Sequence, residues 1–458
     1  MPTDAVNLFP ADFVWGAATA SYQIEGAADE DGRGQSIWDR FAATPGKVRN
    51  GESGAVACDF YHRYPEDVRL MRELGIDAFR FSIAWPRILP DGRGRVNHAG
   101  LDFYDRLVDE LLAAGIQPFA TLYHWDLPQV LEDRGGWPAR EIVDAFAEYA
   151  EAVAGRLGDR IAFWITHNEP QVAAWQGYGW GRHAPGRTSA ADAFAAAHHL
   201  LLSHGAAVEI LRRDAKDAQV GITLNIHPVY PASASEADRE ASRRLDGLEN
   251  RWFLDPVFRG EYPEDVLGGL GADAPPVADG DLRAIAAPID FLGVNNYSRH
   301  IVGAGANGSG PVHLRNPHSP YTDMDWEIYP DALFALLLRV RDEYAPPSIY
   351  ITENGAAFPD VRGHDGSVRD PERQAYLAAY IEAVGRAVEA GVPVHGYFVW
   401  SLLDNFEWGF GYWKRFGVVY VDYPTLERVP KGSFHWYRDF IARQRVAAPR
   451  SAEETRAP

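Results

Sequence analysis

A repeated alternation of helical and strand patterns, joined each time through a glycine, is the strongest constraint on how this 458-residue chain folds. Residues 65–75, 101–115 and 370–391 carry apolar side chains at helical spacing, and each of these segments ends on a glycine. A strand pattern begins directly after each glycine. This order is typical of the repeating unit of parallel α/β proteins.

Eight strand candidates can be counted along the chain, near residues 13–18, 77–83, 117–123, 161–167, 219–226, 289–295, 348–352 and 394–400. Eight strands separated by helices predict an α/β fold with a single (β/α)8 TIM barrel over residues 1–445, followed by a polar, frayed tail at 446–458. Long irregular stretches follow strands, at 42–58, 296–328, 355–369 and 404–430. We therefore expect long loops at the C-terminal face of the strands, where barrel enzymes carry their sites.

Composition excludes several classes of protein. Hydrophobic residues make up 46% of the chain, which is ample for a large core. The formal net charge of −20 argues against binding to nucleic acid or to an anionic membrane surface. The single cysteine, Cys58, cannot form a disulfide framework or a Cys-rich metal site. We see neither a signal peptide nor an apolar run long enough to span a bilayer, so we expect a soluble cytoplasmic protein.

Polar and aromatic residues stand where the predicted strands end. One charged strand end is explained as well by an ordinary ion pair, but six such ends meeting at one rim predict a polar cleft with aromatic walls. These strand-end residues are Arg80, His124, Trp125, Asn168, Glu169, Asn295, Tyr297, Glu353 and Trp400.

Two of these strand ends deliver a glutamate from an apolar strand, Glu169 in "FWITHNEP" and Glu353 in "IYITENG". Burying a carboxylate is costly unless the charge is paired or used. Glycoside hydrolysis needs two carboxyl groups with different protonation states, one to protonate the leaving oxygen and one to face the anomeric carbon. The alternative interpretation is that the two glutamates belong to two unrelated buried ion pairs and have no catalytic role.

The ordered motifs resemble those of glycoside hydrolase family 1, the retaining β-glucosidase-like enzymes, over about residues 8–442. The motifs that carry the resemblance are "FVWGAATASYQIEGA", "HWDLPQ", "NEP", "HAPG", "WEIYP", "ITENG" and "SLLDNFEW". The resemblance implies a retaining β-glycosidase, a β-glucosidase in the first place, with Glu169 as acid/base and Glu353 as nucleophile. It implies no metal and no organic cofactor.

Further residues are placed around the two glutamates. Arg80 and Tyr297 are available to keep Glu353 ionised, and Asn168, supported by Asn295, can reach the sugar 2-hydroxyl. A retaining mechanism predicts carboxyl groups ~5–5.5 Å apart. The resemblance also implies a set of substrate-binding residues. Trp400 resembles the platform beneath the sugar, and Trp326 resembles the wall on the aglycone side. The other members of the set are sugar-hydroxyl ligands and neighbouring aromatic residues: Gln23, His124, Trp125, Glu407, Trp408 and Phe416.

The substrate class rests on a few positions. A carboxylate at Glu407 would repel a 6-phosphate, so we expect unphosphorylated β-glycosides such as glucosides, galactosides, fucosides or cello-oligosaccharides, although Lys414 leaves the phospho-glycosidase alternative open. Three positions depart from the family pattern, and we expect them to tune activity rather than abolish it: His167, Asn296 and Asp325.

Several alternatives remain open from sequence. They are a transglycosylase using the same intermediate, a 6-phospho-β-glycosidase, a non-catalytic sugar-binding barrel and a metal-dependent barrel hydrolase. "GAGANG" at 303–308 matches a dinucleotide fingerprint but precedes no helix pattern, so a barrel loop is expected. His198, His199 and His204 share a helical stretch and predict helix packing rather than a metal site. The sequence does not distinguish a monomer from a homo-oligomer.

Overall fold

The structure, a computed structural model, describes residues 8–306 and 310–447. Most of the expected C-terminal tail and part of "GAGANG" lie outside these residues. Within them, no helix combines the length and the apolar character that crossing a membrane requires.

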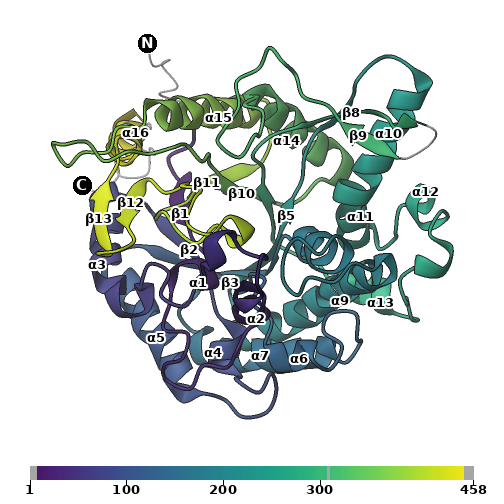
Figure 1. The fold of residues 1–458 in the computed structure, drawn as a ribbon, viewed down its shortest axis with the longest axis horizontal. Helices are drawn as coiled ribbons and strands as arrows, with labels where there is room; N and C mark the ends of the chain where they lie inside the picture. Colours follow the sequence, from purple (N-terminus) through teal and green to yellow (C-terminus); the bar gives the residue numbers. More distant parts are fainter. Residues whose placement is uncertain (1–7, 307–309, 448–458) are drawn as a thin grey trace, which may run out of the picture.

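Eight parallel strands close into a barrel at the centre of the molecule (Figure 1). Their order around the barrel is β1-β11-β10-β7-β5-β4-β3-β2, and every neighbouring pair is parallel. The predicted single barrel is therefore confirmed, with each strand within about two residues of its expected place. The strands are β1 Val14–Ala18, β2 Ala78–Ser82, β3 Gln117–Tyr123, β4 Phe163–Asn168, β5 Gln219–Asn225, β7 Phe291–Asn295, β10 Ile349–Asn354 and β11 Val394–Trp400.

Long helices surround the barrel and cover its outer face (Figure 1). They are α3 Phe60–Leu74, α5 His98–Ala113, α7 Ile142–Leu157, α9 Ala190–Asp214, α14 Pro330–Tyr344, α15 Pro371–Glu389 and α16 Gly432–Ala447. Shorter helices occupy the connections: α1 Ser21–Ile24, α2 Ile37–Ala43, α4 Trp85–Ile88, α6 Gln129–Glu132, α8 Pro170–Val172, α10 Glu236–Asp246, α11 Trp252–Arg259, α12 Glu264–Leu267 and α13 Asp281–Ile285.

Glycines make the turns from helix to strand. Gly75, Gly115 and Gly391 adopt φ of 77°, 74° and 81°, a left-handed conformation that glycine enters without a Cβ penalty. Ile76, Ile116 and Val392 follow them and are buried between strand and helix. The turn chemistry predicted from the sequence is confirmed at all three positions.

Aromatic side chains fill the interior of the barrel beneath the strand ends. Phe119, Phe163, Phe291, Tyr350 and Phe398 form one buried cluster, separate from the larger core between strands and helices. Phe119 and Phe163 stack with ring centroids 4.1 Å apart. The interior is thus a packed core, and it leaves space for ligands only above this aromatic layer.

Two of the loops expected to be irregular contain small sheets. Strands β8 His300–Ala304 and β9 Pro311–His313 join β6 Val229–Pro231, and strands β12 Val419–Asp422 and β13 Glu427–Pro430 form a hairpin. The expectation of irregular structure was wrong there, because these short strands are partly exposed and lack the continuous buried run of the barrel strands. The described part of "GAGANG", residues 303–306, includes the end of β8, which pairs antiparallel with β9.

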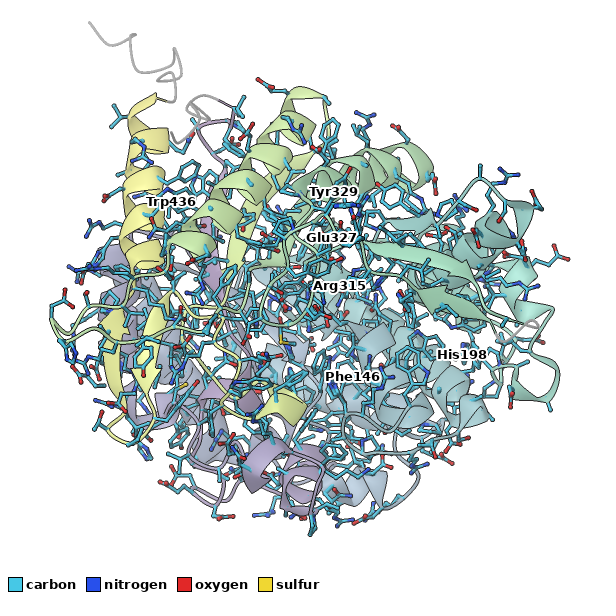
Figure 2. The ribbon with its side chains drawn as sticks, turned by 45° about the horizontal axis from the view of Figure 1, so that its top comes forward. Phe146, His198, Arg315, Glu327, Tyr329 and Trp436 are labelled. Carbon is cyan, nitrogen blue, oxygen red and sulfur yellow. The ribbon has the colours of Figure 1, made fainter. Side chains whose placement is uncertain are left out.

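The histidines of α9 pack against the barrel and its neighbours. His198 Nδ1 lies 2.9 Å from the Tyr262 hydroxyl, and His204 Nδ1 lies 2.7 Å from Thr166 Oγ1 (His198 is labelled in Figure 2). His199 Nδ1 lies 2.9 Å from the Trp137 carbonyl. The three rings therefore point to different partners, and helix packing accounts for them.

Candidate active site

The two glutamates lie at the C-terminal ends of β10 and β4, which β7 and β5 separate around the barrel. Glu353 belongs to β10, and Glu169 follows β4 with φ of 48°. Both side chains are nearly completely buried, and both line one cavity of about 710 Å³. A non-glycine residue at positive φ costs energy, and such residues cluster at functional sites.

A chain of hydrogen bonds connects the two carboxyl groups. Asn295 Nδ2 donates to Glu169 Oε1 at 2.7 Å and to Asn168 Oδ1 at 3.0 Å. Arg80 donates to Asn168 Oδ1 at 2.6 Å and to Glu353 Oε1 at 2.5 Å. All three connecting residues are fully buried, so the relative position of the carboxyl groups is fixed from below.

Glu353 receives a hydrogen bond on each carboxylate oxygen. Arg80 contacts Oε1, and the Tyr297 hydroxyl donates to Oε2 at 2.6 Å. A buried guanidinium and a hydroxyl donor both favour the ionised form of a carboxyl group. The environment expected from the sequence for an attacking carboxylate is therefore present around Glu353.

Glu169 has the opposite environment. Burial raises the pKa of Glu169 to about 8, and the negative charge of Glu353 adds to this increase. The hydrogen bond from Asn295 and the positive charge of Arg80 lower the pKa of Glu169, but they offset only part of this increase. With its pKa raised to about 8, the Glu169 carboxyl group is protonated at neutral pH and can act as an acid.

The predicted substrate residues divide into a cavity wall and a buried layer behind it. His124, Trp125, Tyr297, Trp326, Trp400, Glu407, Trp408 and Phe416 line the cavity with the two glutamates. The residues of the buried layer do not line it: Gln23, Arg80, Asn168 and Asn295.

Gln23 is fully buried, and its amide nitrogen donates to Asn405 and to the Phe406 carbonyl. Its Oε1 has no hydrogen-bond partner within the described chain, and neither does His124 Nδ1. Buried polar atoms are seldom left unpaired in folded proteins. These two atoms are therefore available to a polar ligand.

Glu407 and Trp408 reach the cavity from the loop after β11. Burial raises the pKa of Glu407 to about 8, with a further contribution from the charge of Glu353. Trp408 has φ of 47° and packs against Trp125, with ring centroids 4.7 Å apart. The aromatic wall and the carboxyl group thus share one loop.

The segment that carries Trp326 is held in place by an ion pair. Arg299 makes a bidentate contact with Glu327 at 2.8 and 2.9 Å, and its guanidinium lies 3.5 Å from the ring centroid of Tyr329. Figure 2 labels Glu327 and Tyr329, together with Arg315, which pairs with Asp325. Asp325 has φ of 60°, a left-handed backbone conformation that favours glycine.

The chain matches the model of glycosyl hydrolase family 1 over residues 5–446. The chain belongs to glycosyl hydrolase family 1. Beta-glucosidase A of Acetivibrio thermocellus is 48% identical over 441 residues, covering 94% of this chain and 98% of that protein. A bifunctional beta-D-glucosidase/beta-D-fucosidase of Bifidobacterium breve is 47% identical over 460 residues, covering 95% and 98%.

A solved family 1 structure gives the same fold. The Thermotoga maritima beta-glucosidase in complex with glucoimidazole superposes with a TM-score of 0.93 at 49% identity, covering 95% of this chain and 99% of that one.

The family 1 motifs did not indicate every residue of this cavity. Lys47, Gln176, Arg182, His183 and Asn225 line it as well. Asn225 ends strand β5, so the strand-end argument could have found it. Gln176 lies in the π-helical segment Ala173–Gly179, whose wider turn does not follow α-helical periodicity.

Two of the departures from the family 1 pattern, His167 and Asn296, do not line the catalytic cavity. His167 faces the outer helices, where it bonds Ser203 at 2.9 Å and stacks on Phe146 at 4.6 Å (Phe146 is labelled in Figure 2). Asn296 donates to the carbonyls of Ile226 and Ser298. Both are fully buried and brace the barrel rim.

Lys414 does not line the catalytic cavity. Its ammonium group contacts the Asp323 carboxylate at 2.9 Å and lies 3.6 Å from the ring centroid of Trp413. Since this charge is already paired, it offers little to a sugar phosphate.

Proposed function

We propose that this family 1 chain is a retaining β-glucosidase that hydrolyses terminal, unphosphorylated β-D-glucosides by double displacement. The observation that carries the proposal is the contrast between the two buried glutamates. Glu353 accepts hydrogen bonds from Arg80 and Tyr297, whereas burial keeps Glu169 protonated.

In the first step the Glu353 carboxylate attacks the anomeric carbon, and Glu169 gives its proton to the leaving oxygen. A glycosyl-enzyme ester forms and the aglycone departs as an alcohol. In the second step the Glu169 carboxylate takes a proton from water, the water oxygen attacks the anomeric carbon, and the bond to Glu353 breaks. The separation of ~5–5.5 Å expected for a retaining pair remains a prediction.

The remaining cavity residues hold the sugar. We propose that Gln23, His124 and Glu407 bind its hydroxyls, that Asn168 contacts the 2-hydroxyl, and that Trp400 lies beneath the ring. Trp125, Trp408 and Phe416 complete the walls around the sugar. Trp326 then borders the aglycone, which in cello-oligosaccharides is a further glucose.

The family relationship extends the proposal to other sugars. The Bifidobacterium breve relative is named for both glucosidase and fucosidase activity. We therefore include β-fucosides and β-galactosides as secondary substrates. A cytoplasmic location and a role in cellulose breakdown are further proposals.

The test is hydrolysis of an aryl β-glucoside, with the anomer of the first-formed sugar identified by proton NMR. Retention requires β-glucose first, while α-glucose would refute Glu353 as the nucleophile. Absence of turnover on glucosides, galactosides and fucosides would favour a phospho-glycosidase or a binding protein. Transfer to an added alcohol at the expense of hydrolysis would identify a transglycosylase.

A further inference from the structure

Three side chains outside the catalytic pair converge beside a second cavity. His227, Glu249 and His300 each place one donor atom within 4.8 Å of the other two. All three line a cavity of about 540 Å³, which adjoins the catalytic cavity and shares Tyr297 and Trp326 with it. The group therefore lies on the aglycone side of the proposed active site.

The spacing of these donors suits a small tetrahedral cation. His300 Nε2 and Glu249 Oε2 are 3.4 Å apart. Two ligands at ~2.0–2.1 Å from a tetrahedral zinc ion are separated by about 3.3–3.4 Å. One edge of the tetrahedron thus exists already, and the donor atom of His227, which lies within 4.8 Å of the other two, has to approach them to complete a face.

Two of the side-chain atoms in this group make no hydrogen bond within the described chain. His227 Nδ1 and Glu249 Oε2 are buried and make no hydrogen bond to the described residues. The His227 ring also makes a contact with the backbone of Ser298. Metal-binding histidines typically use one nitrogen for the metal and the other for such a contact.

The backbone around the three residues is held rigidly. Asn250 accepts a hydrogen bond from the His227 N–H at 3.0 Å and donates to the His227 carbonyl at 2.7 Å, which fixes His227 relative to the neighbouring Glu249. Glu249 lies in the π-helical segment Gly247–Arg251, a form of helix that is frequent at functional sites. His300 opens β8, and its N–H donates to the Pro228 carbonyl.

We propose that His227, Glu249 and His300 form a binding site for one divalent transition-metal ion, with Zn²⁺ as the ion that best suits two imidazoles and a carboxylate. The fourth position faces the second cavity and is open to water or to a ligand hydroxyl. The imidazoles bind as neutral donors and Glu249 as the anion, so the site carries a net charge of +1 when Zn²⁺ is bound.

The site is tested by titrating the metal-free full-length chain with ZnCl₂, with binding followed by calorimetry and by metal analysis after equilibrium dialysis. We expect one Zn²⁺ per chain. Glu249→Gln and His300→Gln should each weaken binding by about 100-fold or more, because each removes a direct ligand. His364→Asn, which removes an exposed histidine from a different loop, should bind like the wild type.

Absence of a saturable site in the wild type would overturn the proposal, as would equal binding by wild type and both ligand variants. Should the variants fail to fold, Co²⁺ added to the unmodified chain gives a second test. Intense visible absorption of four-coordinate Co²⁺ supports the site, and the weak absorption of six-coordinate aqueous Co²⁺ refutes it.

A functional consequence rests on the proposed glucosidase activity. Zn²⁺ at this place should raise KM for cellotetraose at least several-fold more than KM for a small aryl glucoside, and Glu249→Gln should remove the difference. If zinc binds but raises both KM values equally, the metal site stands and a role for it in aglycone binding is excluded. Loss of turnover on every glucoside would contradict the proposed function and leave the binding result intact.

Discussion

Burial and the negative charge of Glu353 both raise the pKa of Glu169. Since the pKa is raised to about 8, the carboxyl group is protonated through the neutral range and loses its proton as the pH rises through 8. The proposed acid role requires the protonated form, so kcat/KM should fall on the alkaline side with an apparent pKa near that value.

Glu169→Gln should therefore remove the alkaline limb of the pH profile. It should also lower kcat/KM about 10²–10⁴-fold for glucosides with poorly activated leaving groups. Aryl glucosides whose leaving group needs no proton are the control and should lose much less in the glycosylation step. An unchanged alkaline limb in the variant would assign that limb to another group.

Glu407, which we propose binds a sugar hydroxyl, illustrates the cost of burying a carboxyl group. Burial raises its pKa to about 8 from the ordinary 4.5, so the folded state binds the proton more tightly than the unfolded state. Stability therefore falls as the pH rises from about 4.5 to 8. Glu407→Gln should stabilise the protein by about 1 kcal/mol at pH 8, with little change at pH 4.

Thermal unfolding at the two pH values measures this difference. We expect the same variant to lose most of its activity on unsubstituted glucosides, because the proposed hydroxyl ligand is altered. A variant that is destabilised equally at both pH values would show that Glu407 contributes through packing instead.

At the scale of the element, glycines in the barrel strands make room for the aromatic layer. A Cβ at Gly16 in β1 would come within 2.4 Å of the Phe398 ring. Gly16→Ala should cost about 1–3 kcal/mol in the free energy of unfolding, because the ring has to leave its packed position. Urea unfolding measures this loss.

Gly155 offers a matched control for that substitution. It is exposed within helix α7, and a Cβ there meets nothing within 4 Å. Gly155→Ala should leave stability unchanged or increase it by up to about 1 kcal/mol. Equal effects at the two positions would contradict the packing explanation.

The sequence predicted the strands that have a continuous buried apolar run and missed those that do not. The eight barrel strands, with their buried apolar runs and the glycine turns at Gly75, Gly115 and Gly391, could be placed within about two residues. Strands such as β9 and β12 are short and partly exposed, so they have no such signal. The π-helical segment with Gln176 escaped because its geometry breaks the 3.6-residue period.

At the scale of the whole molecule, a buried ion network joins the site loop to the end of the chain. Lys431, directly before α16, contacts Asp360 Oδ2 at 2.5 Å and Asp404 Oδ1 at 2.7 Å. Arg373 pairs with Asp360 as well, and Arg415 pairs with Asp404. The sequence predicted that the strand ends meet at one rim of the barrel. It gave no sign that buried ion pairs would connect the loops after β10 and β11 to the start of α16.

Lys431→Met should destabilise the protein by about 3–5 kcal/mol, because it leaves two buried carboxylates without their shared cation. The control is Arg362→Gln, which breaks the partly exposed pair with Glu427 and should cost less than about 1 kcal/mol. Both values come from urea unfolding. Similar losses of stability in the two variants would show that the buried network contributes no more to stability than an exposed ion pair.

The aromatic layer of Phe119, Phe163, Phe291, Tyr350 and Phe398 closes the barrel from below. A sugar held above it cannot leave through the barrel, so it enters and leaves on the side of the strand ends. If the enzyme works as proposed, the aglycone has to depart before the glucose can, and glucose has to depart before the next chain end arrives. We therefore expect one glucose to be released per encounter, and free glucose to compete directly with substrate for the empty enzyme.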